Sequence, residues 1–213
     1  MPRKNVQPLP ILKAAMALAD ECGWAQVSLR DIAARADVPF SELYALAPGK
    51  GAVIALFRRH IDTAMLRAVE AEAETPPGAA ELSVRDRLFD ILMARLDALT
   101  PYRAGARAVF AALACDPLAI VCDRPSRDRS MRAVLEAAGI DTAGLRGAVR
   151  VQALAFVWGD VFRVWIKEGA GDQSKTMARL DRDLAKLDAL ARRVECCAPP
   201  APPLTGAKRE ASQ

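Results

Sequence analysis

Residues 11–57, ILKAAMALADECGWAQVSLRDIAARADVPFSELYALAPGKGAVIALF, decide the fold of this chain. Apolar residues recur in this stretch at spacings of three and four, which is typical of amphipathic helices. Gly23 predicts the end of a first helix, and Ser28 with Asp31 three residues later predicts the capped start of a second. The stretch therefore predicts one longer helix, two short helices around a tight turn, and a further helix, which is the layout of a helix-turn-helix with supporting helices.

The outer surface of the third helix is the part of this layout that can enter a DNA groove. Residues 37–39 form the turn, and Pro39 suits the first position of a new helix. We expect that third helix over about residues 39–45, with Leu43 facing inward, and a long fourth helix from Lys50. The outer face of the third helix then presents Phe40, Ser41, Glu42, Tyr44 and Ala45.

The composition of the 213-residue chain favours an all-α fold. Apolar residues make up 52% of the chain and aromatic residues only 5%, while alanine, the strongest helix former, is abundant. The net charge of +4 is compatible with a nucleic-acid partner without being diagnostic of one.

The cysteines and the single histidine limit the kinds of site and the cellular compartment that we expect for this chain. Five cysteines and one histidine do not have the spacing of a metal site or of a disulfide framework, so we expect no metal, no cofactor and reduced thiols in the cytoplasm. No stretch approaches 18 uncharged apolar residues and no cleavage site follows the first apolar run, so neither membrane insertion nor secretion is expected. Without a Ser-His-Asp group, a phosphate loop or a carboxylate constellation, the chain is not expected to be an enzyme.

A break in composition at residues 75–80 separates this region from a helical body. Residues 116–125 hold two prolines and are expected to be irregular. We expect a head of residues 1–48, a regulatory and dimerisation body of residues 49–195, and a Pro-rich, disordered tail of residues 196–213. The helices expected in the body cover about residues 84–99, 102–115, a stretch ending near 139, 145–167, and 173–195 with a heptad seam.

The segment SLRDIAARADVPFSELYALAPGK, residues 28–50, resembles the DNA-binding signature of the TetR family of bacterial regulators. The likeness extends over roughly residues 9–60. It rests on Ser28 followed by Ile32 and Ala33, a turn at residues 36–38, Leu43 and Tyr44 in the third helix, and Lys50 at the start of the fourth.

This resemblance implies a transcriptional regulator, typically a ligand-responsive repressor, that binds double-stranded DNA. It implies a homodimer in which the last two helices of each subunit form a four-helix bundle and place two heads on a near-palindromic operator. Contacts to the DNA backbone are implied for Ser28, Arg30, Tyr44 and Lys50, with Arg3 and Lys4 from the N-terminus. Positions near base edges are implied for Pro39, Phe40, Ser41 and Glu42.

The third helix departs from this family pattern, and the departure motivates a second hypothesis. It has no lysine or arginine and one glutamate, although residues 1–60 contain eight basic and five acidic residues. The segment VRDRLFDILMARLDALTPYRAGARAVFAAL, residues 84–113, is similar to the body of a ubiquinone-biosynthesis lipid-binding protein that has the TetR fold and is not a repressor. The alternative is therefore a lipid or isoprenoid carrier that does not bind DNA.

Several aromatic residues of the body are candidates for a pocket that binds a small hydrophobic ligand. Trp158, Phe162 and Trp165 share one face of a helix, where core packing and lining a cavity are both possible uses. The full set of pocket candidates is Leu92, Tyr102, Phe110, Trp158, Phe162 and Trp165.

Overall fold

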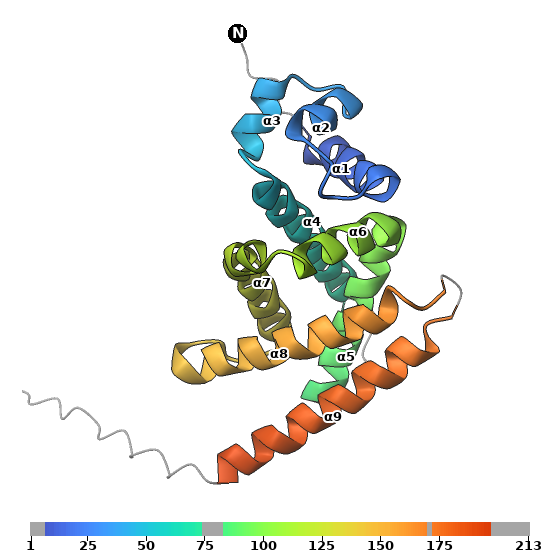
Figure 1. Cartoon of the computed structure of the whole chain (residues 1–213). Helices are drawn as coiled ribbons and strands as arrows, with labels where there is room; N and C mark the ends of the chain where they lie inside the picture. The colour runs from blue at the N-terminus through green and yellow to red at the C-terminus, as the bar shows by residue number, and fades with distance from the viewer. Residues whose placement is uncertain (1–6, 74–82, 170–171, 197–213) are drawn as a thin grey trace, which may run out of the picture.

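The computed structural model describes residues 7–73, 83–169 and 172–196, and these residues form helices and no strand. The expected all-α fold is therefore confirmed. Figure 1 shows a small head of three helices at one end, from which α4 descends into a larger helical body. None of the described helices has the length and apolarity that crossing a bilayer would need.

The helices of the head follow the sequence signals closely. The head consists of α1 (Pro8–Cys22), α2 (Leu29–Arg35) and α3 (Phe40–Leu46). The Ser28 hydroxyl accepts the Asp31 N–H at 3.2 Å, and the Asp31 carboxylate accepts the Ser28 N–H at 3.0 Å. This reciprocal capping box satisfies two N–H groups that the helix itself leaves without a partner, and it fixes where α2 begins.

The end of α2 forms the tight turn of the helix-turn-helix. The Val38 N–H donates to the Ala33 carbonyl at 3.1 Å, and the Asp37 N–H donates to the Ala34 carbonyl at 3.3 Å. These bonds are those of a Schellman motif, which needs a left-handed residue. Asp37 takes that conformation with a φ of 52°, in the place where glycine is usual.

The remaining elements build the body around α4. In the body, α4 packs against both α5 and α7, and α8 packs against α9 (Figure 1). These elements are α4 (Lys50–Ala73), α5 (Val84–Leu99), the short 3-10 helix η1 (Thr100–Tyr102), α6 (Arg103–Ala114), α7 (Pro117–Ala137), α8 (Gly144–Trp165) and α9 (Ser174–Cys196).

The prediction of an irregular segment at residues 116–125 is wrong, because these residues open the continuous helix α7. Asp116 caps this helix by accepting the Ala119 N–H at 3.0 Å, and Pro117 occupies a position where a missing N–H costs nothing. Pro125 lies inside α7, where it removes one backbone hydrogen bond. Arg58 of α4 binds Asp123 and Ser126 on either side of this proline and thereby holds the helix together there.

Head and body share one hydrophobic core. The closest approach is between α1 and α6, where Gly105 lies against the backbone of Met16. Met16 and Leu12 of α1 are buried together with Leu92 and Leu96 of α5. The orientation of the head is therefore coupled to the packing of the body.

The seam expected along the last helix is divided between the inside and the outside of the protomer. Leu180 and Leu184 of α9 are buried within the protomer, whereas Met177 is 44% exposed. The tail expected to be disordered begins at residue 196, and residues 197–213 of it lie outside the described part of the chain.

Candidate nucleic-acid interface and ligand cavity

The outer face of α3 is exposed over most of its residues. Phe40 is 43% exposed and Tyr44 is 53% exposed, and Ser41 lies on the same outer surface. Leu43, on the opposite side of this short helix, is fully buried and anchors it to the head. This separation of one buried leucine from an outer row of aromatic and polar side chains leaves α3 accessible to a partner.

Arg30 supplies a positive charge beside α3 that the helix itself lacks. Its guanidinium carbon lies 5.9 Å from the centre of the Phe40 ring, which is the distance of a cation–π contact. The Phe40 and Tyr44 rings follow one another along α3 with centroids 6.1 Å apart. Arg30, Phe40 and Tyr44 therefore form one continuous surface, which we call the α3 face.

The other predicted residues of the α2–α3 region occupy different environments. Pro39 is exposed and is the N-cap residue of α3, whereas Glu42 is only half-exposed. The Ser28 hydroxyl is exposed but donates to the Asp31 carboxylate at 2.6 Å. Hydrogen bonds from the Ser28 hydroxyl and N–H hold the pKa of Asp31 below its ordinary value.

Lys50 connects the start of α4 to the loop between α1 and α2. Its ammonium group donates to the Trp24 carbonyl at 2.5 Å and to the Ala25 carbonyl at 3.1 Å, and it lies 5.1 Å from the centre of the Trp24 indole. Partial burial lowers the pKa of Lys50. An ammonium group has three N–H donors, so one donor is left for a phosphate after these two bonds. Arg3 and Lys4 lie outside the described residues.

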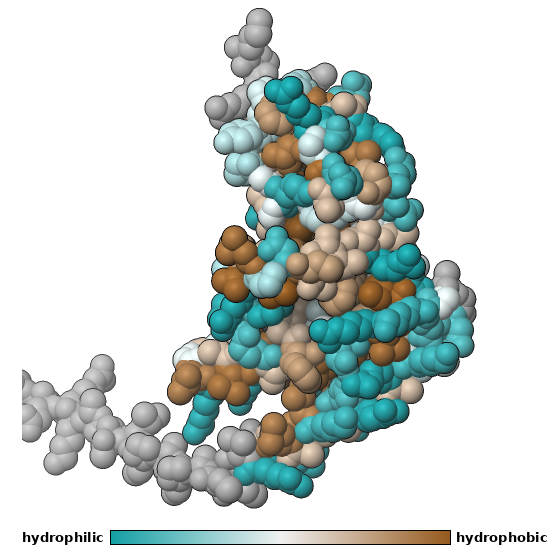
Figure 2. Space-filling view, in the orientation of Figure 1, coloured by the Kyte–Doolittle hydropathy of each residue, from teal (hydrophilic) through white to brown (hydrophobic). Residues whose placement is uncertain are grey.

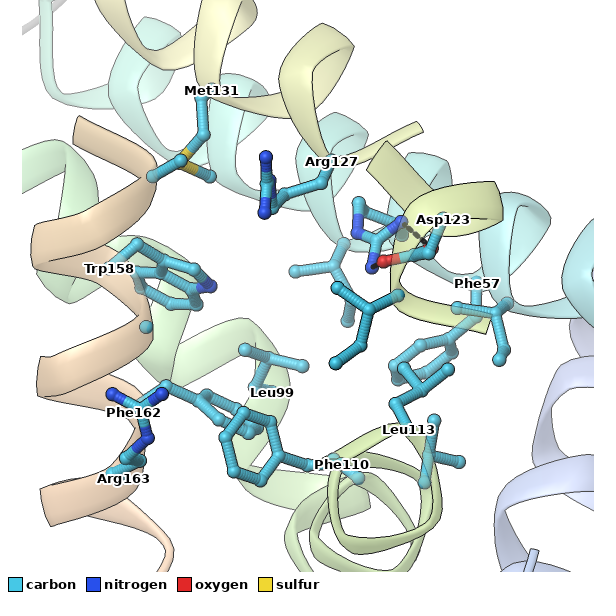
Figure 3. A pocket seen from close by; sticks show the side chains of 18 of the residues that line it. Phe57, Leu99, Phe110, Leu113, Asp123, Arg127, Met131, Trp158, Phe162 and Arg163 are labelled. Carbon is cyan, nitrogen blue, oxygen red and sulfur yellow. Dashed lines mark hydrogen bonds and ion pairs between the residues drawn. The ribbon is translucent and has the colours of Figure 1, made fainter. Parts of the chain in front are cut away.

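A cavity of about 480 Å³ lies in the body between α4, α6, α7 and α8, and α1 and α5 also contribute to its wall (Figure 3). Phe110, Trp158 and Phe162, three of the predicted pocket residues, line it. Phe110 and Phe162 stack with centroids 5.3 Å apart, and Trp158 lies 5.9 Å from Phe162. These three rings form one aromatic cluster on the cavity wall.

The other predicted pocket residues, Leu92, Tyr102 and Trp165, do not line this cavity. Leu92 is fully buried in the core, and the Tyr102 ring packs edge-on against Phe57 with centroids 5.2 Å apart. Trp165 is also fully buried, and the Arg103 guanidinium covers its ring at 4.3 Å. The hydrophobic periodicity of the sequence indicates that these residues face inward, but it does not show whether they fill the core or line a cavity.

Two ion pairs that sequence reasoning did not predict place an arginine at the cavity wall, one partly buried and one with a buried arginine. Arg58 of α4 makes a two-pronged contact with Asp123 of α7, at 2.7 and 2.8 Å (Figure 3). Arg95 of α5 is 3% exposed and binds Asp62 of α4. The Arg95 guanidinium also lies 4.7 Å from the centre of the Trp158 ring. Burial acts to lower the pKa of Arg95 and the Asp62 carboxylate acts to raise it.

The described residues hold no group of three or more His, Cys, Asp or Glu side chains placed to bind a metal ion. The two features that stand out are instead the α3 face on the head and the arginine-rich cavity in the body. A capped α2, a tight turn and an exposed α3 on a buried anchor give the head the architecture of a helix-turn-helix module.

Comparison with known proteins finds a family model that matches the head. Residues 11–56 match the model described as bacterial regulatory proteins, tetR family. The chain as a whole is similar in structure to a TetR transcriptional regulator from Nitrosomonas europaea ATCC 19718, with 23% identity, a TM-score of 0.64, and coverage of 85% of this chain and 98% of that one.

A second solved structure gives the same result. A TetR transcriptional regulator from Rhodococcus sp. RHA1 matches with 23% identity, a TM-score of 0.56, and coverage of 84% of this chain and 93% of that one. At these identities the likeness shows a shared fold that includes the body as well as the head. No curated protein sequence matches the chain.

Proposed function

We propose that this protein is a DNA-binding transcriptional regulator of the TetR type, and that a small ligand in the body cavity controls its affinity for DNA. The observation that carries the proposal is the α3 face: Phe40 and Tyr44 are exposed on a helix held by the buried Leu43, with Arg30 beside them. An exposed short helix following a tight turn is the element that such proteins place in the major groove.

The roles of individual residues follow from what each side chain can offer. Arg30, Tyr44 and the third donor of Lys50 suit phosphate oxygens, which set the register of the protein on the duplex. Ser28, at the N-terminus of α2, places backbone N–H groups near the same strand. Base edges are left to the first turn of α3, formed by Pro39, Phe40, Ser41 and Glu42.

An apolar stripe on α8 supports a homodimer. Leu145 is 83% exposed, Val149 61% and Phe156 77%, and their spacing puts all three on one side of the helix. Met177 and Leu190 add exposed apolar side chains on the neighbouring helix α9. Figure 2 shows hydrophobic surface at one end of α8 and on α9. A second copy that covers this surface would present two heads to a near-palindromic operator.

The cavity is placed to influence the head, because it is lined by the two helices that carry the head. Met16 comes from α1, and Ile54 and Phe57 come from α4. A ligand that binds one arrangement of α1 and α4 better than the other shifts the population toward it, and a near-complete switch requires roughly 10⁴-fold different affinities. Release of an operator on ligand binding in the cytoplasm is the mode of action we propose.

Salt dependence of DNA binding tests this function. The purified protein is titrated onto its own promoter region and onto unrelated DNA of equal length at several salt concentrations. A regulator binds the promoter more tightly, and its affinity falls steeply with salt because phosphate contacts release counterions. Absence of salt-sensitive binding, together with lipid that co-purifies with the protein, would instead establish the lipid or isoprenoid carrier.

Sequencing of genomic DNA captured by the purified protein extends this test. A regulator enriches a small set of sites that share a near-palindromic sequence, since two heads related by two-fold symmetry read two half-sites. Enrichment without a shared sequence would contradict specific recognition by the first turn of α3.

A further inference from the structure

The charged side chains at the cavity wall do not all have a full counter-charge. Four arginines and one aspartate line the cavity: Arg58, Arg95, Arg127, Arg163 and Asp123. Arg58 is matched by Asp123, and Arg95 is matched by Asp62. These two pairs are neutral overall and connect α4 to α7 and α5. The remaining two arginines are in a different situation.

Arg127 of α7 shares its carboxylate with a second arginine. Its Nε and one Nη donate to Asp128 at 3.2 and 3.0 Å, and the same Nη donates to Gln152 at 3.2 Å. Arg124 also contacts the Asp128 carboxylate, at 3.4 Å. Two guanidinium groups therefore meet one carboxylate, and the other Nη of Arg127 has no protein partner within the described ranges. Figure 3 shows the Arg127 side chain projecting from α7 into the cavity.

Arg163 of α8 is also incompletely neutralised. Its contact with Asp160 is long, at 3.9 Å, and Asp160 is bound more closely by Arg179 of α9. Arg179 and Lys186 in turn share Asp183. Across these described residues three cations meet two carboxylates. The Arg163 guanidinium also lies 5.8 Å from the centre of the Phe110 ring, at the apolar wall of the cavity.

We infer that the cavity binds an amphipathic acid, a molecule with an apolar chain or ring system and one terminal anionic group. The apolar part lies between the aromatic side chains Phe57, Phe110, Trp158 and Phe162, and the anionic group lies at Arg127, whose side chain is 32% exposed. Arg163 lies about three turns further along α8 than Gln152, the partner of Arg127, and its side chain is 57% exposed, so it adds positive charge at the other end of the aromatic wall. A cavity of about 480 Å³ is within the size range of small-molecule sites. The inference deepens the proposed function, since it names the class of ligand for the cavity that the proposal invokes.

The preference for an anion follows from the polarity of the site. A guanidinium group that faces a partly enclosed apolar space gains a strong hydrogen-bonding partner when a carboxylate or phosphate enters, and its planar fork suits either group. A neutral molecule leaves the charge of Arg127 as it is, and an ammonium group adds a like charge beside it. Arg95 reinforces the site, because this 97% buried arginine leaves its Nε without a hydrogen-bond partner in the described structure.

Calorimetric titration of the full-length protein with ten-carbon probes, without DNA, tests this inference. The probes are decanoate, decyl phosphate, decanol and decylammonium, each below the concentration at which it aggregates. We expect one or both acids to bind at least about tenfold more tightly than decanol, and decylammonium to bind more weakly still. The two acids then distinguish a carboxylate site from a phosphate site. Equal affinity for decanol and the better acid, or no binding of either acid at millimolar concentration, would overturn the inference.

Variants assign the effect to Arg127. Arg127→Met keeps an apolar stem of similar length and removes the charge, and it should reduce the preference for the acid over decanol several-fold. Arg129→Met is the matched control, because Arg129 is exposed on α7 and does not line the cavity. Should Arg127→Met fail to fold, Arg127→Gln removes the same charge, and an unchanged preference in a folded variant contradicts the assignment.

This experiment is separate from the test of DNA binding. If the protein binds the acid but shows no salt-sensitive promoter binding, the inferred ligand class stands and the proposed regulatory function is wrong. If it binds the promoter and its cavity does not prefer an acid over decanol, the proposed function stands and the inferred ligand class is wrong.

Discussion

A Cβ atom added to Gly105 of α6 would lie 2.3 Å from the carbonyl oxygen of Met16 in α1. Side chains cannot approach a backbone atom this closely, so the crossing of the two helices requires glycine at this position. Met16 also lines the body cavity. The crossing of α1 and α6 is thus a backbone contact at the edge of the cavity, so a ligand bound there, as we propose, would act beside a contact between head and body.

Gly105→Ala should destabilise the protein by about 1–3 kcal/mol, because the added methyl group forces α1 and α6 apart. It should also weaken DNA binding, since α1 supports the head. Denaturant unfolding and promoter titration measure the two effects. Gly51→Ala is the control: a Cβ at Gly51 meets nothing within 4 Å, so the change in stability should be within about 0.5 kcal/mol. Equal effects of the two substitutions would refute the role of the crossing.

Arg30→Ala should weaken binding to all DNA sequences several-fold and lower the slope of log affinity against log salt by about 0.9, the value for one phosphate contact. Arg35→Ala is a matched control on the same helix, because Arg35 is exposed and binds Glu21 of α1 at 2.8 and 2.6 Å. Its salt slope should stay close to that of the unmodified protein. A loss of slope in the control and not in Arg30→Ala would place the DNA on the other side of α2.

Substitution of Ser41 or Glu42 should change which sequences are bound, whereas Lys50→Ala and Tyr44→Ala should weaken binding to every sequence. The reason is that base edges carry the sequence information and phosphates do not. A change of preference at a base-contacting residue corresponds to about 1–3 kcal/mol at one base pair. Binding to a randomised library of operator variants measures it, and a uniform loss for Ser41 and Glu42 variants would contradict their assignment.

Glu168 at the end of α8 should make stability depend on acid pH. Partial burial acts to raise its pKa, but hydrogen bonds from the Thr176 hydroxyl and from the Lys175 and Thr176 N–H groups, at 2.8 and 3.0 Å for the latter two, outweigh burial and hold the pKa below its ordinary value of 4.5. A carboxylate with a lowered pKa in the folded state stabilises the fold above pH 4.5, and this contribution is lost as the pH falls through the lowered pKa.

Thermal unfolding between pH 5.5 and pH 3 checks this pH dependence. Glu168→Gln should have a lower Tm than the unmodified protein at pH 5.5, and the difference should shrink toward pH 3. Glu136→Gln is the control, as the Glu136 carboxylate accepts only the Thr142 hydroxyl, at 2.7 Å, among the described contacts. A difference that is constant over this range would show that Glu168 acts by packing and not by charge.

Leu145→Asp should shift the protein from dimer to monomer. Leu145 is 83% exposed in the protomer, so an aspartate there costs the protomer itself little, and it costs a dimer much if a second copy covers the residue. Sedimentation over a range of concentrations measures the dissociation constant, which should rise by at least tenfold. Leu118→Asp, at a residue of α7 that is 72% exposed, is the control. An unchanged dissociation constant for Leu145→Asp would place the interface elsewhere.

The local features of the head were predictable from sequence, because each depends on residues a few positions apart. The capping box joins Ser28 and Asp31, and the left-handed turn uses Asp37, whose N–H donates to the Ala34 carbonyl three residues earlier. The exposed face of α3 was predictable for the same reason, because the burial of one residue, Leu43, determines which side of this short helix faces outward.

The features that sequence reasoning missed depend on partners far apart in the chain. Arg58 and Asp123 are 65 residues apart, and their contact helps to keep α7 helical across Pro125. The charge on the cavity wall has the same origin, because Arg127 faces the cavity only once α7 and α8 are packed. Sequence spacing identified the aromatic wall at Phe110, Trp158 and Phe162 but could not identify the cations around it.

The bonds from Lys50 to the Trp24 and Ala25 carbonyls have a mechanical consequence. They hold the first turn of α4 against the head, so a tilt of the α4 axis moves the head with it. Over the 24 residues of α4, at 1.5 Å rise per residue, a tilt of about 5° would displace the head by about 3 Å, close to the rise of one base pair.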